Sequence, residues 1–390
     1  MWKKGSLAVV ATAIAFLIVE LSLRFIVPEV LGYEGILAGA ADHPERLFPA
    51  YTRMTYNVTG LYRGAGEATL RVGPQRFIDP EPQGPCRYRV LFLGGSTTEA
   101  IYVPEPDRWV ALMNEPGYLG AFNAGQSGAN TVDKYFTLKY LAHDKGMRFD
   151  LIVLMTAIND LAWMRQLDSV GRNLEIPNYQ DHLRAWRLSE QRKKEESISF
   201  LQTRTGALIS QAVQRAVSAD TVVERYCQVR DEALARYSAK TVTLASSAQS
   251  QRELRDYEAN ARRNLAVLNK LAREMGARLL VLSEATSFAA PSSSYLVDVR
   301  YPLDFDGGLP SLVETQTYFE QLNAAYLRAA RDLNISTFDL AGELGPLLNG
   351  PHGGEYMYDG CHYTPAGCRE VARVLGPVLR GMLEADCRRD

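Results

Sequence analysis

The sequence lacks the signatures of several common protein classes. No P-loop, GxGxxG or HExxH pattern occurs, so these markers of phosphate, dinucleotide and zinc-protease chemistry are missing. The five cysteines form no CxxC pair and no zinc-ligand spacing. Forty-three basic and 45 acidic residues give a net charge of −2, which leaves no basic excess for binding nucleic acid. We therefore expect neither a metal centre nor a nucleic-acid partner.

Charge is also missing from a long segment at the amino terminus. Lys3 and Lys4 precede an uncharged stretch over 5–19, and residues 5–27 as a helix would be about 34 Å long, enough to cross a bilayer. The two lysines predict that the amino terminus stays in the cytoplasm. We expect a single transmembrane anchor over 1–28, with the remaining chain in the periplasm or outside the cell. A cleaved signal peptide is the alternative.

Residues 29–85 contain many glycines and prolines and no long periodic segment, so we predict a stalk and a wrapping segment here. Two cysteines flank the domain that follows. Cys86 precedes its first predicted strand, and Cys387 follows its last predicted helix. Because disulfides are allowed in an exported chain, we hypothesise a Cys86–Cys387 bridge. The sequence predicts no oligomeric state.

The domain over 86–390 alternates apolar runs of strand length with segments of helical period. Strands are predicted over 88–95, 121–125, 150–157, 277–283 and 336–340, and helices over 108–114, 131–145, 254–275, 315–332 and 367–383. This alternation predicts a parallel sheet with helices on both faces. Residues 161–250 interrupt it. We expect a helical insertion there, either over the carboxyl edge of the sheet or as a peripheral helical pair.

The first strand of this domain ends at a serine. Gly94 and Gly95 stop the apolar run and allow a sharp turn, and Ser96 follows directly. In an open α/β sheet, ligands bind at the carboxyl ends of the strands. A simple helix cap is the alternative interpretation of Ser96, since serine often starts helices.

Three further stretches beside predicted elements each hold a polar residue or a backbone donor that suits acyl chemistry. Gly128 follows the second strand, Asn159 follows the third, and Asp359 and His362 precede the final helix. A serine hydroxyl needs a base to become a nucleophile, and His362 is a candidate for that base. Asp359, three residues earlier, could orient the imidazole. The backbone N–H groups of Ser96 and Gly128 and the amide of Asn159 could stabilise an oxyanion.

Four stretches of the chain, in this order, resemble the four blocks of the SGNH/GDSL hydrolase superfamily. They are Gly94-Gly-Ser96, Asn123-Ala-Gly-Gln-Ser-Gly128, Ala157-Ile-Asn-Asp160 and Asp359-x-x-His362. The resemblance implies a flavodoxin-like three-layer α/β/α fold with a five-stranded parallel sheet of order 2-1-3-4-5. It also implies a Ser96, Asp359 and His362 triad with Ser96, Gly128 and Asn159 as oxyanion donors. We expect no metal or organic cofactor, because this mechanism needs none.

Two positions differ from the family blocks: Gly95 stands where the family has aspartate, and Ala157 stands where it has glycine. Two other residues were weighed as alternatives. Ser127 lies in a near match to the G-x-S-x-G elbow of α/β-hydrolases, but the final glycine is missing. His352, between Pro351 and Gly353, is interpreted as a loop residue.

Members of the superfamily are esterases, lipases, carbohydrate O-acetylesterases and some acyltransferases. We therefore expect a membrane-anchored serine esterase that hydrolyses an O-acyl ester, most simply O-acetyl, on an extracytoplasmic glycan or similar envelope substrate. Two alternatives stay open. One is an O-acyltransferase that uses the same triad, and the other is a non-catalytic envelope scaffold or binding protein with a degenerate site.

Overall fold

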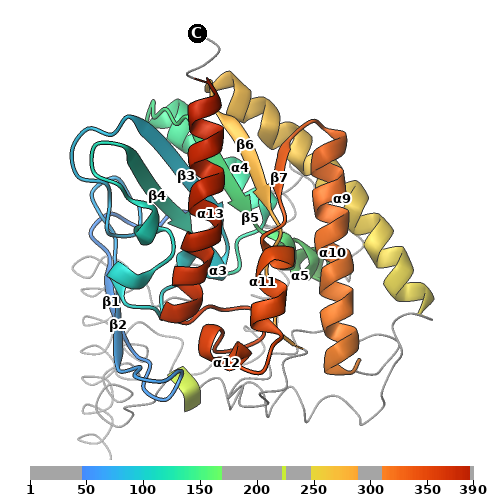
Figure 1. The fold of residues 1–390 in the computed structure, drawn as a ribbon. Helices are drawn as coiled ribbons and strands as arrows, with labels where there is room; N and C mark the ends of the chain where they lie inside the picture. The colour runs from blue at the N-terminus through green and yellow to red at the C-terminus, as the bar shows by residue number, and fades with distance from the viewer. Residues whose placement is uncertain (1–45, 169–221, 225–246, 289–309, 387–390) are drawn as a thin grey trace, which may run out of the picture. The chain divides into compact units, whose positions relative to one another are not determined.

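The computed structural model describes residues 46–168, 222–224, 247–288 and 310–386 (Figure 1). The predicted anchor over 1–28 and most of the predicted insertion lie outside these residues. Within the described ranges, no helix combines the length and the apolar character needed to span a bilayer.

A five-stranded parallel sheet forms the centre of the fold. Its strands are β3 (Tyr88–Gly94), β4 (Leu119–Gly125), β5 (Leu151–Met155), β6 (Arg278–Leu282) and β7 (Ser336–Phe338). They lie side by side in the order β4-β3-β5-β6-β7 and all pair in parallel. Counted along the chain within this sheet, they are the second, first, third, fourth and fifth strands. The sequence of β5 is entirely apolar and β5 is buried throughout, as a central parallel strand covered on both faces must be.

Helices cover both faces of this sheet (Figure 1). One face packs against the last helix, α13 (Pro365–Asp386), and against α11 (Leu340–Leu348), whose leucines share one core cluster with β3, β5 and β6. On the opposite side α4 (Thr131–Lys139), α9 (Ala248–Glu274) and α10 (Leu312–Asp332) pack together. The buried residues of α9 recur every three or four positions, so one stripe of this helix faces the core.

The register of the strands places three loops at one level. Gly94, the last residue of β3, pairs with Gly125 at the end of β4 and with Met155 at the end of β5. The chain therefore leaves the sheet at the same carboxyl edge in all three places, and the residues that follow come close together.

A second, two-stranded sheet lies in the segment that the sequence analysis treated as non-periodic. β1 (Arg53–Asn57) pairs antiparallel with β2 (Glu67–Arg71). In β2, Ala68 and Leu70 are buried, Thr69 between them is partly exposed and the two flanking residues are exposed, which is the period of two of a half-buried strand. Further along, the N–H of Ile78 donates to the carbonyl of Asn123 at 2.9 Å, which joins this segment to β4.

Several predicted boundaries were wrong. A single helix over 108–114 is replaced by two short 3₁₀ turns, Glu105–Asp107 and Ala111–Met113. The guanidinium of the buried Arg108 donates to the backbone carbonyls of Ala100, Val103, Asp79 and Thr69, which fixes the chain in a loop.

Other helix limits also differ from the prediction. α4 ends at Lys139 and continues as a π-helical turn over Tyr140–Asp144. α5 (Ala157–Asp168) runs into the segment predicted as an insertion, and α9 begins six residues earlier than predicted, at Ala248. The thiol of Cys86 is free, and Cys387, the second residue of the hypothesised bridge, lies outside the described residues.

Candidate active site

Ser96 is the first residue of α3 (Ser96–Glu99), a single helical turn directly after β3. Its Oγ lies 2.7 Å from Nε2 of His362. With the imidazole neutral and Nδ1 protonated, the hydroxyl donates to Nε2, which is the arrangement that lets a base take the serine proton. The structure thus brings the predicted nucleophile and the predicted base into contact across 266 positions of the chain.

Asp359 holds the other side of the same imidazole. Its Oδ2 lies 2.6 Å from Nδ1 of His362, and its Oδ1 accepts the backbone N–H groups of Cys361 and His362 at 2.8 and 2.7 Å. The Asp359 side chain is fully buried. Burial opposes a charge on His362, but the adjacent carboxylate outweighs this and raises the pKa of His362 well above its usual value.

One group of side chains lies close enough together to be considered as metal ligands. The ligand atoms of Asp359, Cys361 and His362 lie within 4.8 Å of one another. Two ligands on a tetrahedral zinc ion, each about 2.0–2.1 Å from it, would lie about 3.3 Å apart. The Asp359–His362 separation of 2.6 Å is too short for that and suits a hydrogen bond. The donor set therefore fits a proton-transfer pair and not a metal centre.

Asn159 lies in the first turn of α5, beside the turn that carries Ser96. Its Nδ2 donates to the carbonyl of Ala129 at 3.0 Å. A Cβ placed on Gly95 would lie 2.0 Å from this same Nδ2, so the Asn159 carboxamide fills the space where a side chain at position 95 would be. The absence of a side chain at Gly95 is therefore what allows Asn159 to approach the Ser96 turn.

Gly128 lies in the loop after β4, next to the residue that binds Asn159. Its φ is +71°, a conformation that favours glycine. Its carbonyl accepts the indole N–H of Trp163 at 2.8 Å. Asn130 closes the loop by capping α4, since its side chain accepts the N–H groups of Val132 and Asp133. Gly128, in the loop after β4, and Asn159, in the first turn of α5, thus flank Ser96.

The alanine that replaces a family glycine causes no backbone strain. Ala157 begins helix α5 and is not among the residues with positive φ. Its side chain is fully buried. The helical turn that carries Asn159 therefore accommodates the methyl group.

Glu284 was not predicted, although it joins two of the site's loops. It lies two residues after the end of β6 and is buried. Its Oε1 accepts the hydroxyl of Thr97 at 2.6 Å, and its Oε2 accepts the N–H of Ile158 at 2.9 Å. These two donors adjoin Ser96 and Asn159. Burial raises the pKa of Glu284. A charged residue immediately after an apolar strand was the available signal in the sequence.

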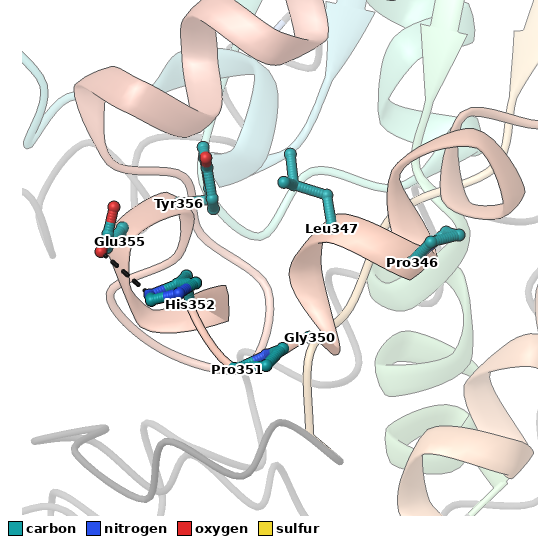
Figure 2. Close-up of a pocket in the computed structure, with 7 residues that line it drawn as sticks. All are labelled: Pro346, Leu347, Gly350, Pro351, His352, Glu355 and Tyr356. Carbon is teal, nitrogen blue, oxygen red and sulfur yellow. Dashed lines mark ion pairs between the residues drawn. The ribbon is translucent and has the colours of Figure 1, made fainter.

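The two alternative residues take no part in this arrangement. Ser127 donates both its N–H and its hydroxyl to Glu99, a buried carboxylate at the end of α3. His352 pairs with Glu355 at 3.4 Å beside a shallow pocket of about 310 Å³ between α11 and α12 (Gly353–Tyr356), which Figure 2 shows. None of the triad residues lines this pocket.

Comparisons with family models and with curated proteins found no match. Solved structures do match. Phospholipase A1 from Streptomyces albidoflavus NA297 is 14% identical, with 75% of this chain and 98% of that chain covered and a TM-score of 0.40. An acetylxylan esterase from Geobacillus stearothermophilus is 14% identical, with 74% and 92% covered and a TM-score of 0.36. An aryl esterase from M. smegmatis is 14% identical, with 75% and 99% covered and a TM-score of 0.36.

These matched proteins are two esterases and a phospholipase. With 14% identity and TM-scores below 0.5, these structures carry no argument about the chemistry of this chain. The roles of the site residues rest on the hydrogen bonds of this chain.

Proposed function

We propose that the protein is an SGNH-type serine hydrolase that cleaves a carboxylic ester. The observation that carries this proposal is the continuous chain of hydrogen bonds from Ser96 Oγ to His362 Nε2 (2.7 Å) and from His362 Nδ1 to Asp359 Oδ2 (2.6 Å). A buried carboxylate, an imidazole and a serine in this order form the arrangement that activates a hydroxyl for acyl transfer.

The proposed reaction proceeds in two halves. Ser96 Oγ attacks the ester carbonyl while its proton moves to His362 Nε2, and Asp359 stabilises the imidazolium. The N–H groups of Ser96 and Gly128 and the Asn159 amide donate to the resulting oxyanion. The intermediate collapses, the alcohol leaves with the proton from His362, and Ser96 keeps the acyl group. Water, deprotonated by His362, then attacks the acyl-enzyme. The bond between the acyl carbon and Ser96 Oγ breaks, His362 returns the proton to Ser96 Oγ, and the acid is released.

The proposed substrate is an O-acyl ester, most simply O-acetyl, on a glycan or similar component of the cell envelope. This part rests on the apolar run over 5–27, which would place the domain outside the cytoplasm as a single-pass membrane protein. The same triad would serve an acyltransferase if a sugar hydroxyl replaced water as the acceptor.

The test compares the full-length protein with its Ser96→Ala variant. Hydrolysis of p-nitrophenyl acetate and covalent labelling by a fluorophosphonate probe are measured for both. We expect turnover and labelling in the wild type and neither in Ser96→Ala. Ser127→Ala is the matched control, since Ser127 is the rival serine in the neighbouring loop, and this variant should still be labelled.

The remaining outcomes separate the alternatives. Labelling at Ser96 without turnover would favour a transferase that lacks its acceptor. If the folded wild-type protein shows neither signal, the serine mechanism is wrong and a non-catalytic binding role becomes the better account.

A further inference from the structure

The imidazole of His362 stacks on an aromatic ring that the sequence analysis did not single out. Tyr358 and His362 lie nearly parallel, with an interplanar angle of 6° and ring centroids 5.5 Å apart. The N–H of Tyr358 donates to the carbonyl of His362 at 3.0 Å. Tyr358 is 6% exposed, so its ring is held in place by other groups.

Two further tyrosines hold the Tyr358 ring. The centroid of Tyr62 lies 6.2 Å from that of Tyr358, and the centroid of Tyr102 lies 6.4 Å from it. The hydroxyl of Tyr62 donates to the backbone carbonyl of Tyr102 at 2.8 Å, which ties the two together. We call Tyr62, Tyr102 and Tyr358 the tyrosine wall.

Segments outside the parallel sheet build this wall. Tyr62 belongs to the connection between β1 and β2, and Tyr358 shares an apolar cluster with residues from that segment and from the predicted insertion. The other buried members of the cluster are Val58, Leu61, Ala68 and Val222. Val222 is 2% exposed. The amino-terminal strand pair and a described part of the insertion therefore meet beside the candidate base.

The groups that bind the His362 ring nitrogens all lie at the edge of the imidazole. They are Ser96 at Nε2, and Asp359 and, at 3.5 Å, the Cys361 sulfur at Nδ1. Hydrogen bonds at the ring edge resist small tilts of the ring plane less than a group packed on the ring face does. A flat aromatic face parallel to the imidazole opposes that tilt, because close stacking is lost when the ring rotates. The same face attracts the imidazolium that forms when His362 takes a proton.

We propose that Tyr358, held by Tyr62 and Tyr102, is a positioning residue that keeps the His362 imidazole aligned with both Ser96 and Asp359. The inference rests on the proposed role of His362 as the general base. It assigns a catalytic purpose to the amino-terminal strand pair and to the segment around Val222, which together keep Tyr358 in place.

The experiment uses the full-length protein with two substitutions of Tyr358. Tyr358→Phe keeps the ring face, whereas Tyr358→Leu removes it. We expect Tyr358→Leu to lower kcat for p-nitrophenyl acetate by about 10- to 100-fold with little change in KM, since misplacement of a catalytic group costs about this much. Tyr358→Phe should restore most of the rate. Tyr88→Leu is the control, because Tyr88 is a similarly buried tyrosine at the opposite end of β3.

Two readouts separate positioning from a general loss of stability. The pH limb of kcat/KM that reports His362 should move to lower pH in Tyr358→Leu, because a tilted ring interacts less with Asp359. Among the described residues, the charged or titratable groups that face this imidazole are Asp359, Cys361, Glu284 and Tyr358 itself. The first three are retained in the variant, and the Tyr358 hydroxyl is lost in both Tyr358→Leu and Tyr358→Phe. The downfield proton NMR signal of the His362 Nδ1–H should weaken in Tyr358→Leu and persist in Tyr358→Phe.

Each outcome decides the inference. Wild-type kcat, pH limb and NMR signal in Tyr358→Leu would overturn it, as would equal losses in Tyr358→Phe or Tyr88→Leu. If Tyr358→Leu does not fold, Tyr62→Leu takes its place, with a smaller loss in the same direction supporting the inference and no loss overturning it. The wild type could lack Ser96-dependent activity while the His362 Nδ1–H signal still weakens in Tyr358→Leu and persists in Tyr358→Phe. In that case the proposed function is wrong, and the role of Tyr358 in positioning His362 is supported.

Discussion

At the residue scale, Gly95 is the position where one added carbon should matter most. Its φ of −87° is acceptable to alanine, so the backbone does not demand glycine. The demand comes from Asn159, whose Nδ2 would lie 2.0 Å from a new Cβ. The block that this segment resembles has aspartate at position 95. Here the position is glycine, and the carboxamide of Asn159 fills the space that a side chain would need.

We predict that Gly95→Ala lowers kcat by about 10²- to 10³-fold, the usual loss of one oxyanion donor, with little effect on KM. Steady-state ester hydrolysis measures this. Gly376→Ala is the control, since a Cβ at Gly376 in α13 meets nothing within 4 Å. In a double-mutant cycle, Gly95→Ala should add little to Asn159→Ala. Fully additive losses would show that Gly95 does not act through Asn159.

At the scale of elements, Glu284 connects three strand ends. It follows β6 and accepts hydrogen bonds from Thr97 after β3 and from Ile158 after β5. The pair formed by Glu284 and Asn323 adds a link to α10, since the Asn323 amide exchanges two hydrogen bonds with the Glu284 backbone. One side chain therefore sets the distance between the nucleophile turn and the Asn159 turn.

We predict that Glu284→Ala lowers the free energy of unfolding by about 2–6 kcal/mol, because a buried and a part-buried donor lose their acceptor at about 1–3 kcal/mol each. Urea unfolding measures this, and ester hydrolysis should fall as well because the two turns separate. Glu284→Gln is the matched control, since its carbonyl keeps one acceptor, and it should lose less than half as much stability. Equal losses in the two variants would contradict the account.

The elements themselves differ in how well the sequence revealed them. The strands of the parallel sheet were predictable because strands buried on both faces, such as β5, read as unbroken apolar runs. β1 and β2 were missed because each has only five residues, of which none is buried in β1 and two are buried in β2, too short a pattern to stand out. α11 was missed because it starts two residues after β7, where the sequence gives no break other than the cap at Asp339.

At the scale of the whole molecule, the site residues that belong to the four sequence blocks were predictable. The buried polar residues outside these blocks were not. The blocks named Ser96, Asp359 and His362, and the fold brings these three into contact. Glu99 and Lys134 are buried, although nothing in their local sequence distinguishes them from surface charges. Whether a charge is buried depends on which loops cover it, and that follows from the assembled fold.

These buried charges should set how the stability of the whole molecule depends on pH. Burial raises the pKa of Glu99 and of Asp160 to about 7, so the folded state holds their protons more tightly than the unfolded chain does. Their contribution to stability is therefore greatest at low pH and is lost as pH rises from about 4 to about 7. Burial lowers the pKa of Lys134 to about 7, so its contribution recovers only as pH rises above 7. Together these shifts predict a minimum in stability near neutral pH.

Glu99→Gln tests this prediction, since the amide removes the proton equilibrium and keeps the shape of the side chain. Relative to the wild type, its free energy of unfolding should gain about 3 kcal/mol between pH 4.5 and pH 7.5, the cost of deprotonating a carboxyl whose pKa is raised from 4.5 to about 7. Urea unfolding at a series of pH values measures the gain, and Asp160→Asn should show the same sign. Parallel stability curves for Glu99→Gln and the wild type would mean that Glu99 is ionised at no cost, so that Ser127 and Lys134 fully offset its burial.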